Sequence, residues 1–147
     1  MNNDIASFLI STDDGDAVIT RARGHGRELA TRLGFPEPRL FLVTIIISEL
    51  ARNIVMYAKV GQISLEIRKR GRTSGLVIVA SDQGPGIANL ERALLCGYST
   101  SGSNGCGLPA VSRIADDFSI DTRPGVGTTV NVALWPDRPQ RAFRPLT

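Results

Sequence analysis

The sequence predicts an α+β fold in which helices cover one face of a β-sheet. Residues 40–59 are almost continuously apolar, and this run is too long for a strand, so it predicts a buried helix. Residues 62–70 alternate apolar and polar side chains, as a half-buried strand does, and a glycine-containing turn leads from them to a second apolar run at 76–81. A chain of 147 residues has the size of one domain, and helices mixed with hairpin strands are typical of the α+β class.

The N-terminal part of the chain predicts a strand and an amphipathic helix. Residues 5–10 form a short apolar run that ends in the turn-forming sequence STDDG, which is typical of a strand followed by a loop. Residues 17–33 carry apolar side chains at helical spacing with basic ones between them, and Gly34 suits the end of that helix. Gly24 and Gly26 weaken the helix by about 1 kcal/mol each relative to Ala.

The C-terminal half differs in composition, because eight of the 15 glycines lie between Gly84 and Gly127. Within it, residues 110–118 predict a helix and residues 119–122 a strand. Residues 128–135 predict a last strand, which follows the turn sequence PGVG. The motifs GxGxxG and GxxxxGK[ST] are both absent, which argues against a Rossmann or P-loop domain.

Composition excludes several classes of protein. Apolar residues make up 42% and charged residues 21% of the chain, which excludes wholesale disorder. The longest apolar stretch, residues 40–47, is far shorter than the about 20 residues of a bilayer span, and the N-terminal sequence has no signal-peptide pattern. We therefore expect a cytoplasmic protein without a membrane segment. Two cysteines and one histidine are too few for a disulfide framework or a zinc site.

The formal net charge of +3 says little about partners, because three arginines and one aspartate in residues 137–147 contribute two of those charges. The chain has no cluster of Lys and Arg with interleaved aromatic residues, so we expect no nucleic-acid partner. Residues 137–147 are rich in Pro and Arg and predict a flexible tail behind a domain of residues 1–136.

Glu49 and Asn53 are the first candidate site residues. They lie four residues apart on the predicted long helix, so both side chains point at one place. They continue a row of apolar residues that includes Ile46 and Met56, where an unpaired carboxylate is costly. Either this end of the helix emerges into solvent, with Glu49 bonded to Arg52 or Asn53, or the pair serves a site. Because immediate neighbours on a helix do not share a face, we expect Arg52 to be a surface or partner-contact residue.

Three glycine-containing segments add further candidates. Asp82 stands at the end of a predicted strand and is followed by Gly84 and Gly86, which makes either an ordinary turn or a carboxylate aimed into a cleft. Residues 97–107 combine glycines and hydroxyls before a predicted helix start, which favours either phosphate binding under a mobile lid or a flexible loop. Residues 125–129 form either a plain hairpin turn or a strand entry whose Thr hydroxyls face the cleft.

In this order, the segments resemble the motifs of the GHKL ATPases, which include gyrase, Hsp90, histidine kinases and MutL. Within that superfamily, the chain is most similar to the small serine/threonine kinases of bacterial partner-switching pathways, the group of the stressosome kinases. The matching segments cover most of residues 16–135 and read ISELARNIVMYAKVGQI, SDQGPGIANLERALLCGYSTSG, GCGLPAVSRIADDFSI and RPGVGTTVNVALW. The resemblance implies a Bergerat-type two-layer sandwich that binds ATP, with a mixed, mostly antiparallel sheet and helices on one face.

The resemblance also implies roles for the polar candidates. Asn53 would ligate the Mg²⁺ that bridges the ATP phosphates, and Glu49 would act as the general base that draws the proton from the substrate hydroxyl. Asp82 would recognise the adenine amine. These roles agree with the needs of phosphoryl transfer, which depends on charge neutralisation, positioning and a base near the hydroxyl.

The remaining implied contacts with ATP come from glycines and hydroxyls. Gly84 and Gly86 would let the backbone approach the base, and Thr128 would line the adenine side of the pocket. The residues that the resemblance places over the triphosphate are Ser99, Thr100, Ser101, Gly102, Gly105, Gly107 and Leu108, with backbone amides supplied by Gly105 and Gly107.

The chain departs from the family pattern at the end of the lid. Where relatives tend to have a run like GGLGLGL, this chain has SNGCGL, so Asn104 and Cys106 replace apolar residues. Cys106 is either an inert buried thiol or a redox-sensitive one. We expect His25, the single histidine, to be a surface residue of the first helix.

The resemblance therefore implies a protein kinase that uses ATP and Mg²⁺ to phosphorylate Ser or Thr in a STAS-domain antagonist. Family members of this type also switch a second partner, commonly a PP2C-type phosphatase. The alternative is a non-catalytic ATP-binding module, either an anti-sigma factor or a sequestering scaffold. Glu49 discriminates between the two, because a module that only sequesters a partner has no use for a base at this position.

Overall fold

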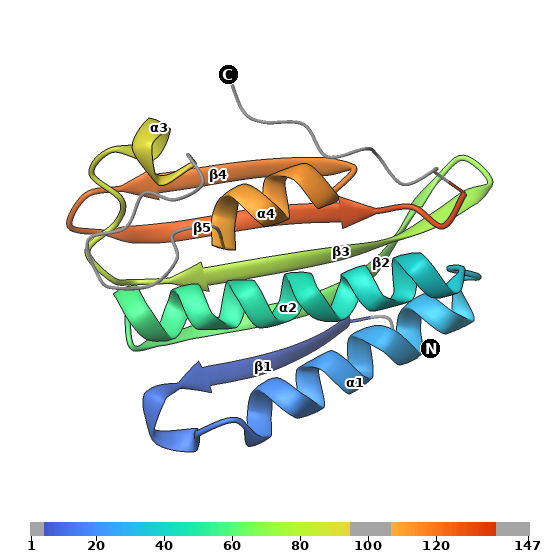
Figure 1. Cartoon of the computed structure of the whole chain (residues 1–147), viewed down its shortest axis with the longest axis horizontal. Coiled ribbons are helices and arrows are strands. Elements are labelled where there is room, and N and C mark those ends of the chain that lie inside the picture. Colours follow the sequence, from blue (N-terminus) through green and yellow to red (C-terminus); the bar gives the residue numbers. More distant parts are fainter. Residues whose placement is uncertain (1–4, 95–106, 138–147) are drawn as a thin grey trace.

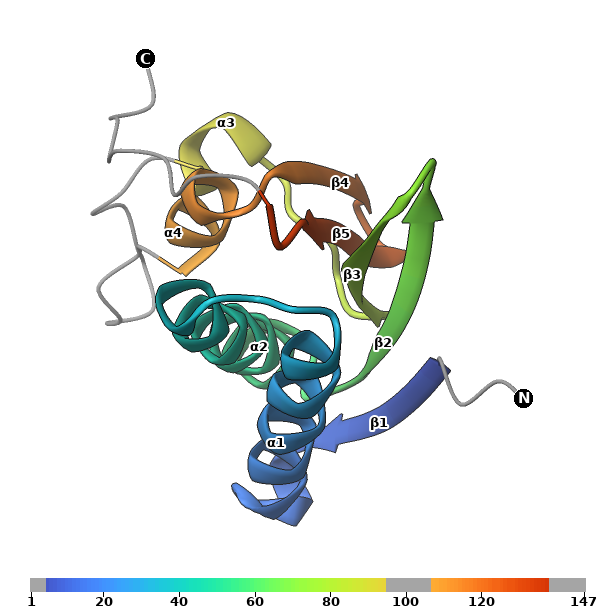
Figure 2. The ribbon, with the colours of Figure 1, turned by 90° about the vertical axis from the view of Figure 1, so that its right-hand side faces the viewer.

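The fold rests on a five-stranded sheet that carries helices on one face. The computed structural model describes residues 5–94 and 107–137, and its strands lie in the order β1-β2-β3-β5-β4 (Figure 1). Helices α1, α2 and α4 form the second layer (Figure 2). In chain order the elements are β1 (Ile5–Ser11), the 3₁₀ turn η1 (Thr12–Asp14), α1 (Ala17–Arg32), α2 (Glu37–Tyr57), β2 (Val60–Arg70), β3 (Thr73–Asp82), α3 (Leu90–Ala93), α4 (Gly107–Ile114), β4 (Asp117–Arg123) and β5 (Gly127–Leu134).

This arrangement confirms the predicted α+β class and its two layers. The sheet is more uniform than expected, because all four strand pairings between described residues are antiparallel. The last strand in the chain, β5, lies between β3 and β4 and so brings the C-terminal hairpin next to the end of β3. The division into a domain of residues 1–136 and a tail stays a prediction.

Several predicted boundaries are corrected. The predicted helix at 110–118 is α4, which begins at Gly107 and ends at Ile114, while Asp117 and Phe118 already belong to β4. These two residues pair with β5, and that long-range pairing outweighs their local helical pattern. Helix α2 begins at Glu37 because Pro38 lies in its first turn, where the missing N–H has no intrahelical partner to lose. The short helix α3 was not predicted.

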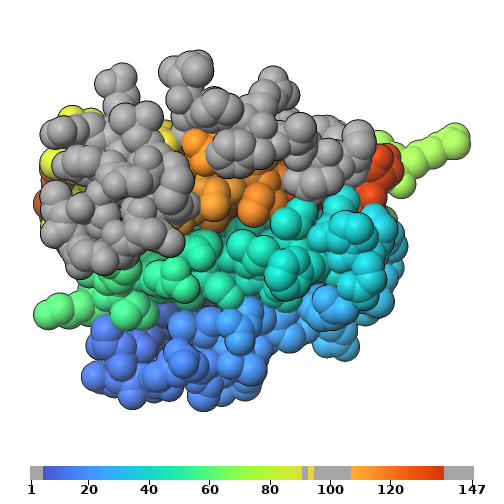
Figure 3. Space-filling model, in the orientation of Figure 1, coloured from blue at the N-terminus to red at the C-terminus, as the bar shows by residue number. Residues whose placement is uncertain are grey.

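Helix α2 is the centre of the core and lies between α1 and α4 (Figure 3). By length and apolar content alone it is long enough to cross a membrane. In this fold, however, its apolar side chains pack into the core between the sheet and the neighbouring helices. Its buried residues are Arg39, Leu40, Val43, Ile46, Ile47, Leu50, Ala51 and Ile54.

Helix α1 packs closely on α2 because of one glycine. A Cβ atom added to Gly26 would lie 2.5 Å from Cδ1 of Ile47, a distance that real Cβ contacts do not reach. The residue that weakens α1 locally therefore permits the close approach of the two helices. His25, next to it, is not the surface residue that we expected, because it is half-buried and packs edge-on against Phe8 of β1 with 5.8 Å between the ring centroids.

A buried ion pair joins the first turn of α2 to the C-terminal half of the sheet. A guanidinium nitrogen (Nη2) of Arg39 donates to Oδ2 of Asp116, and both side chains are almost fully buried. The same oxygen accepts the backbone N–H of Trp135 at 2.8 Å. The Trp135 ring in turn covers Gly75 on β3 and lies under the guanidinium of Arg70, 4.2 Å from the ring centroid. One carboxylate therefore connects α2, the start of β4 and the end of β5.

We predict that Arg39→Met destabilises the protein by about 3–5 kcal/mol, because it leaves the buried Asp116 carboxylate without its cation. Urea unfolding measures the effect. Arg27→Met is the matched control, since Arg27 pairs at 2.9 Å with Glu37 where both side chains are exposed, and its loss costs less than about 1 kcal/mol. Equal unfolding free energies for the two variants would contradict this role of the buried pair.

Candidate functional site

The carboxylate of Asp82 lies on the helix-facing side of the sheet, at the end of β3. It continues the line of Ile78 and Ala80, which are buried in the core, because side chains alternate along a strand. Its neighbours in the sheet are Gly61 on β2 and Thr128 on β5. Oδ1 of Asp82 accepts the backbone N–H of Gly84 at 2.9 Å, while Oδ2 receives no hydrogen bond from the described residues. One carboxylate oxygen is therefore held and the other is available.

Three glycines allow the backbone segments around Asp82 to come together. A Cβ atom on Gly84 would lie 2.6 Å from Cβ of Ala58, just beyond α2. One on Gly86, whose φ is +79°, would lie 2.4 Å from a backbone oxygen of the β4–β5 hairpin. One on Gly127 would lie 2.2 Å from the backbone oxygen of Asp82. The turn after β3 is thus packed between the end of α2 and the hairpin, with no room for side chains at these positions.

Thr128 is buried beside Asp82 and belongs to a small hydroxyl network. Its Oγ1 lies 2.8 Å from Oγ1 of Thr122 on the paired strand β4. Thr122 also accepts the backbone N–H of Ile87 at 2.8 Å, which fixes the segment that follows Gly86. The structure therefore places Thr128 next to Asp82, while its role toward a ligand stays a prediction. Thr122 was missed, and the β4–β5 register is the signal that finds it.

Glu49 and Asn53 are both half-buried on α2, on the side where α4 begins. A Cβ atom on Gly107, the first residue of α4, would lie 3.0 Å from Oε1 of Glu49, so only a glycine leaves that carboxylate its full space. On the other side, Nη1 of Arg52 lies 3.3 and 3.4 Å from the two carboxylate oxygens. The ion pair considered from the sequence is thus present. Arg52 shares the face of Glu49 through the i,i+3 spacing, which the argument from immediate neighbours overlooked.

Asn53 has no hydrogen-bond partner among the described residues, although its side chain is half-buried. The next residue, Ile54, packs on the row of Asp82, because a Cβ on Gly61 would lie 2.8 Å from Cγ2 of Ile54. The last turns of α2 therefore cover this row of the sheet. The structure brings together the end of α2, the end of β3 and the start of α4.

The remaining predicted residues fall into two groups. Leu108 is buried in the core beside the start of α4, so its side chain serves packing. The other predicted lid residues lie outside the residues that the structure describes. These are Ser99, Thr100, Ser101, Gly102 and Gly105, together with Asn104 and Cys106.

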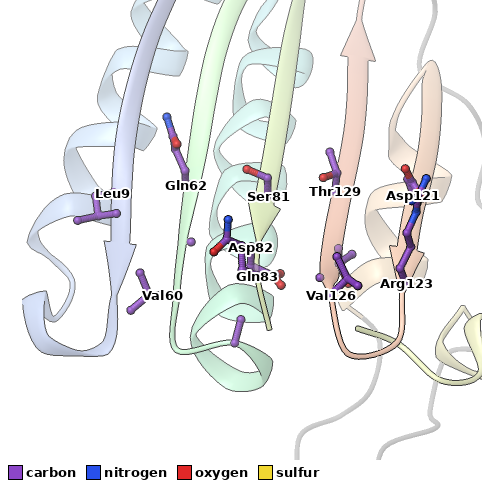
Figure 4. Close-up of a pocket in the computed structure, with 14 residues that line it drawn as sticks. Leu9, Val60, Gln62, Ser81, Asp82, Gln83, Asp121, Arg123, Val126 and Thr129 are labelled. Carbon is purple, nitrogen blue, oxygen red and sulfur yellow. The ribbon is translucent and has the colours of Figure 1, made fainter. Parts of the chain in front are cut away.

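A hollow of about 610 Å³ lies at the same end of the sheet (Figure 4), and Asp82 and Thr128 are among the residues that line it. Its floor is one row of paired residues that crosses all five strands, so these side chains point away from the helices. Neither Glu49 nor Asn53 lines this hollow, and the row of side chains in its floor was not predicted. The residues of the row are Leu9, Gln62, Ser81, Thr129 and Asp121.

Comparison with known proteins agrees with this geometry. Residues 40–139 match the family described as histidine kinase-, DNA gyrase B-, and HSP90-like ATPase. The chain is 46% identical over 118 residues to the serine/threonine-protein kinase RsbT of Bacillus subtilis (strain 168), which covers 80% of this chain and 88% of RsbT. It is also 28% identical over 95 residues to the anti-sigma F factor of Bacillus licheniformis, which covers 61% of this chain and 65% of that protein.

We predict that Gly127→Ala destabilises the protein by about 3 kcal/mol, because the new methyl group would overlap the backbone of Asp82. Gly125→Ala is the matched control in the same hairpin. Gly125 has a φ of +79° but no atom within 4 Å of an added Cβ, so its substitution costs only the about 1 kcal/mol of backbone strain. Urea unfolding compares the two, and a smaller loss for Gly127→Ala than for Gly125→Ala would contradict the close packing.

Proposed function

The chain belongs to the family of histidine kinase-, DNA gyrase B- and HSP90-like ATPases, the GHKL superfamily, and on this premise we propose that it phosphorylates Ser or Thr in a STAS-domain antagonist. It is an RsbT-like serine/threonine-protein kinase that uses ATP. The proposed pathway is a partner-switching pathway of the stressosome type in the cytoplasm. A PP2C-type phosphatase is the proposed second partner. The family resemblance of the sequence motifs supports these finer assignments.

The observation that carries the proposal is the half-buried pair of Glu49 and Asn53 beside the start of α4. The carboxylate has only one counter-charge from the described residues, and the carboxamide has no partner at all among them. Polar groups placed in this way lower stability unless a ligand or a reaction uses them. A carboxylate next to a carboxamide is suited to accept a proton from a hydroxyl that approaches along α2.

The residues present fit ATP and Mg²⁺. Oδ2 of Asp82 accepts no hydrogen bond from the residues that the structure describes, which suits the exocyclic amine of adenine. No group of three or more His, Cys, Asp or Glu side chains that could hold a metal occurs in the part of the chain that the structure describes. Mg²⁺ commonly keeps several waters and substrate phosphates in its octahedral shell, so a single protein oxygen at Asn53 is sufficient.

In the proposed mechanism, Asp82 would recognise the adenine base and Asn53 would hold the metal, while Glu49 would remove the proton from the acceptor hydroxyl. Bound Mg·ATP supplies the phosphoryl group and the neutralisation of its charge. The first turn of α4 begins next to Glu49, and its backbone N–H groups have no acceptors within the helix, which suits phosphate oxygens. Each group therefore acts by position and charge, as phosphoryl transfer requires.

The second candidate is an ATP-binding module that sequesters a partner without chemistry. The similarity to an anti-sigma F factor favours it. Both candidates use Asp82 and Asn53 to bind the nucleotide, so they differ only in the need for a base. We favour the kinase because Glu49 is retained and half-buried next to Asn53.

We predict that the protein, incubated with Mg·ATP and candidate STAS-domain proteins, transfers phosphate to a Ser or Thr that mass spectrometry locates. Glu49→Gln should lower the transfer rate by about 100- to 10,000-fold, the usual contribution of a general base. Its affinity for ATP should change less than about twofold, because the base is not a metal ligand. Transfer at the wild-type rate by Glu49→Gln would remove the residue from this role, and absence of transfer by the wild type would favour the sequestering module.

We predict that Asn53→Ala weakens the binding of Mg·ATP by about tenfold or more, because it removes the proposed protein ligand of the metal. Calorimetry measures the dissociation constant with Mg²⁺ and with EDTA, and the loss should appear mainly with Mg²⁺. Asn131→Ala is the control, since Asn131 is exposed on β5. An unchanged dissociation constant for Asn53→Ala in Mg²⁺ would contradict the metal role.

A further inference from the structure

Arg52 is the only described side chain that forms an ion pair with Glu49, and nothing so far explains it. We propose that Arg52 is a positioning residue that orients the Glu49 carboxylate toward the incoming hydroxyl. The inference rests on the proposed role of Glu49 as the general base. It gives a role in the reaction to a residue that the sequence predicted only as a surface or partner-contact residue.

The geometry restrains Glu49 from two sides. Nη1 of Arg52 lies at nearly equal distances from both carboxylate oxygens, 3.3 Å from Oε1 and 3.4 Å from Oε2. On the side of α4, Gly107 presents bare backbone close to Oε1. A glutamate side chain has several rotatable bonds, and the guanidinium selects the rotamers that keep the carboxylate between Arg52 and α4.

The contact is loose enough to leave the carboxylate able to react. Tight charge-assisted hydrogen bonds between a guanidinium and a carboxylate measure about 2.7–2.9 Å, which is shorter than both distances here. The oxygens of Glu49 therefore keep acceptor capacity for the proton of a hydroxyl. An arrangement that fixes direction without saturating the oxygens is what a base requires.

The two side chains differ in exposure. The side chain of Arg52 is 57% exposed, whereas that of Glu49 is 21% exposed. The guanidinium of Arg52 is therefore mostly in contact with solvent, whereas the carboxylate of Glu49 is largely covered. The pair of Arg27 and Glu37 differs, because both of its side chains are largely exposed and neither lies near the site residues.

The test compares Arg52→Gln, Arg52→Lys and the control Arg27→Gln in phosphate transfer to the STAS-domain substrate. We expect kcat to fall about tenfold in Arg52→Gln. This loss is smaller than the about 100- to 10,000-fold loss expected when the base itself is removed. Arg52→Lys should recover part of the loss, since it keeps the charge but not the planar fork. Arg27→Gln should match the wild type. The KM for the protein substrate and the affinity for ATP should stay within about twofold of the wild-type values. The melting temperature should stay within a few degrees of that of the wild type.

A double variant separates positioning from other roles. In the Glu49→Gln background, Arg52→Gln should cause no further loss, because it acts through the carboxylate. The proposal is overturned if Arg52→Gln keeps the wild-type kcat, if its effect is on KM, or if the same loss persists without Glu49. None of these results contradicts the role of Glu49 as the general base, provided that the single variant Glu49→Gln is inactive. If no STAS-domain protein accepts phosphate, the same variants are compared in the hydrolysis of ATP by water, with the same expected order of rates.

Discussion

The buried contact between Arg39 and Asp116 is the constraint on which the site depends. It fixes the first turn of α2 to the junction of α4 and β4 and, through the same carboxylate, to Trp135 at the end of β5. Because a helix rises about 1.5 Å per residue, fixing one end of α2 also determines where Glu49 lies along the sheet. Burying two charges is expensive, and such a pair adds little net stability over apolar residues. What it adds here is a unique position for α2.

At the other end, glycines determine how closely α2 approaches the sheet. Ile54 packs where Gly61 has no side chain, and Ala58 packs on Gly84 in the turn after Asp82. Each contact lies closer than any Cβ atom would permit, so the distance between the helix and the edge of the sheet is set by the backbone itself. The site is therefore held between a polar contact at one end of α2 and close backbone packing at the other.

This division explains what could be predicted from the sequence. The long helix, the β2–β3 hairpin and the shared face of Glu49 and Asn53 follow from local periodicity, and they are confirmed. The position of β5 between β3 and β4 depends on pairing across the chain, which no local pattern contains. For the same reason, the end of α4 was predicted at the wrong residue and Thr122 was not recognised as a site residue. The ion pair of Glu49 was only one of several alternatives, since the i,i+3 spacing permits the contact but does not require it.

The loss of folding stability that Glu49 causes bears on the choice between a kinase and a sequestering module. On the same helix face, Ile46 is buried in the core, and a half-buried carboxylate there lowers stability unless it is compensated. The compensation from the described residues is one largely exposed arginine, and such pairs contribute only about 0–1 kcal/mol. A protein that only held a nucleotide and a partner would gain by replacing this glutamate with an apolar residue. The presence of this carboxylate therefore supports the proposed kinase, in which Glu49 would remove the proton from an attacking hydroxyl.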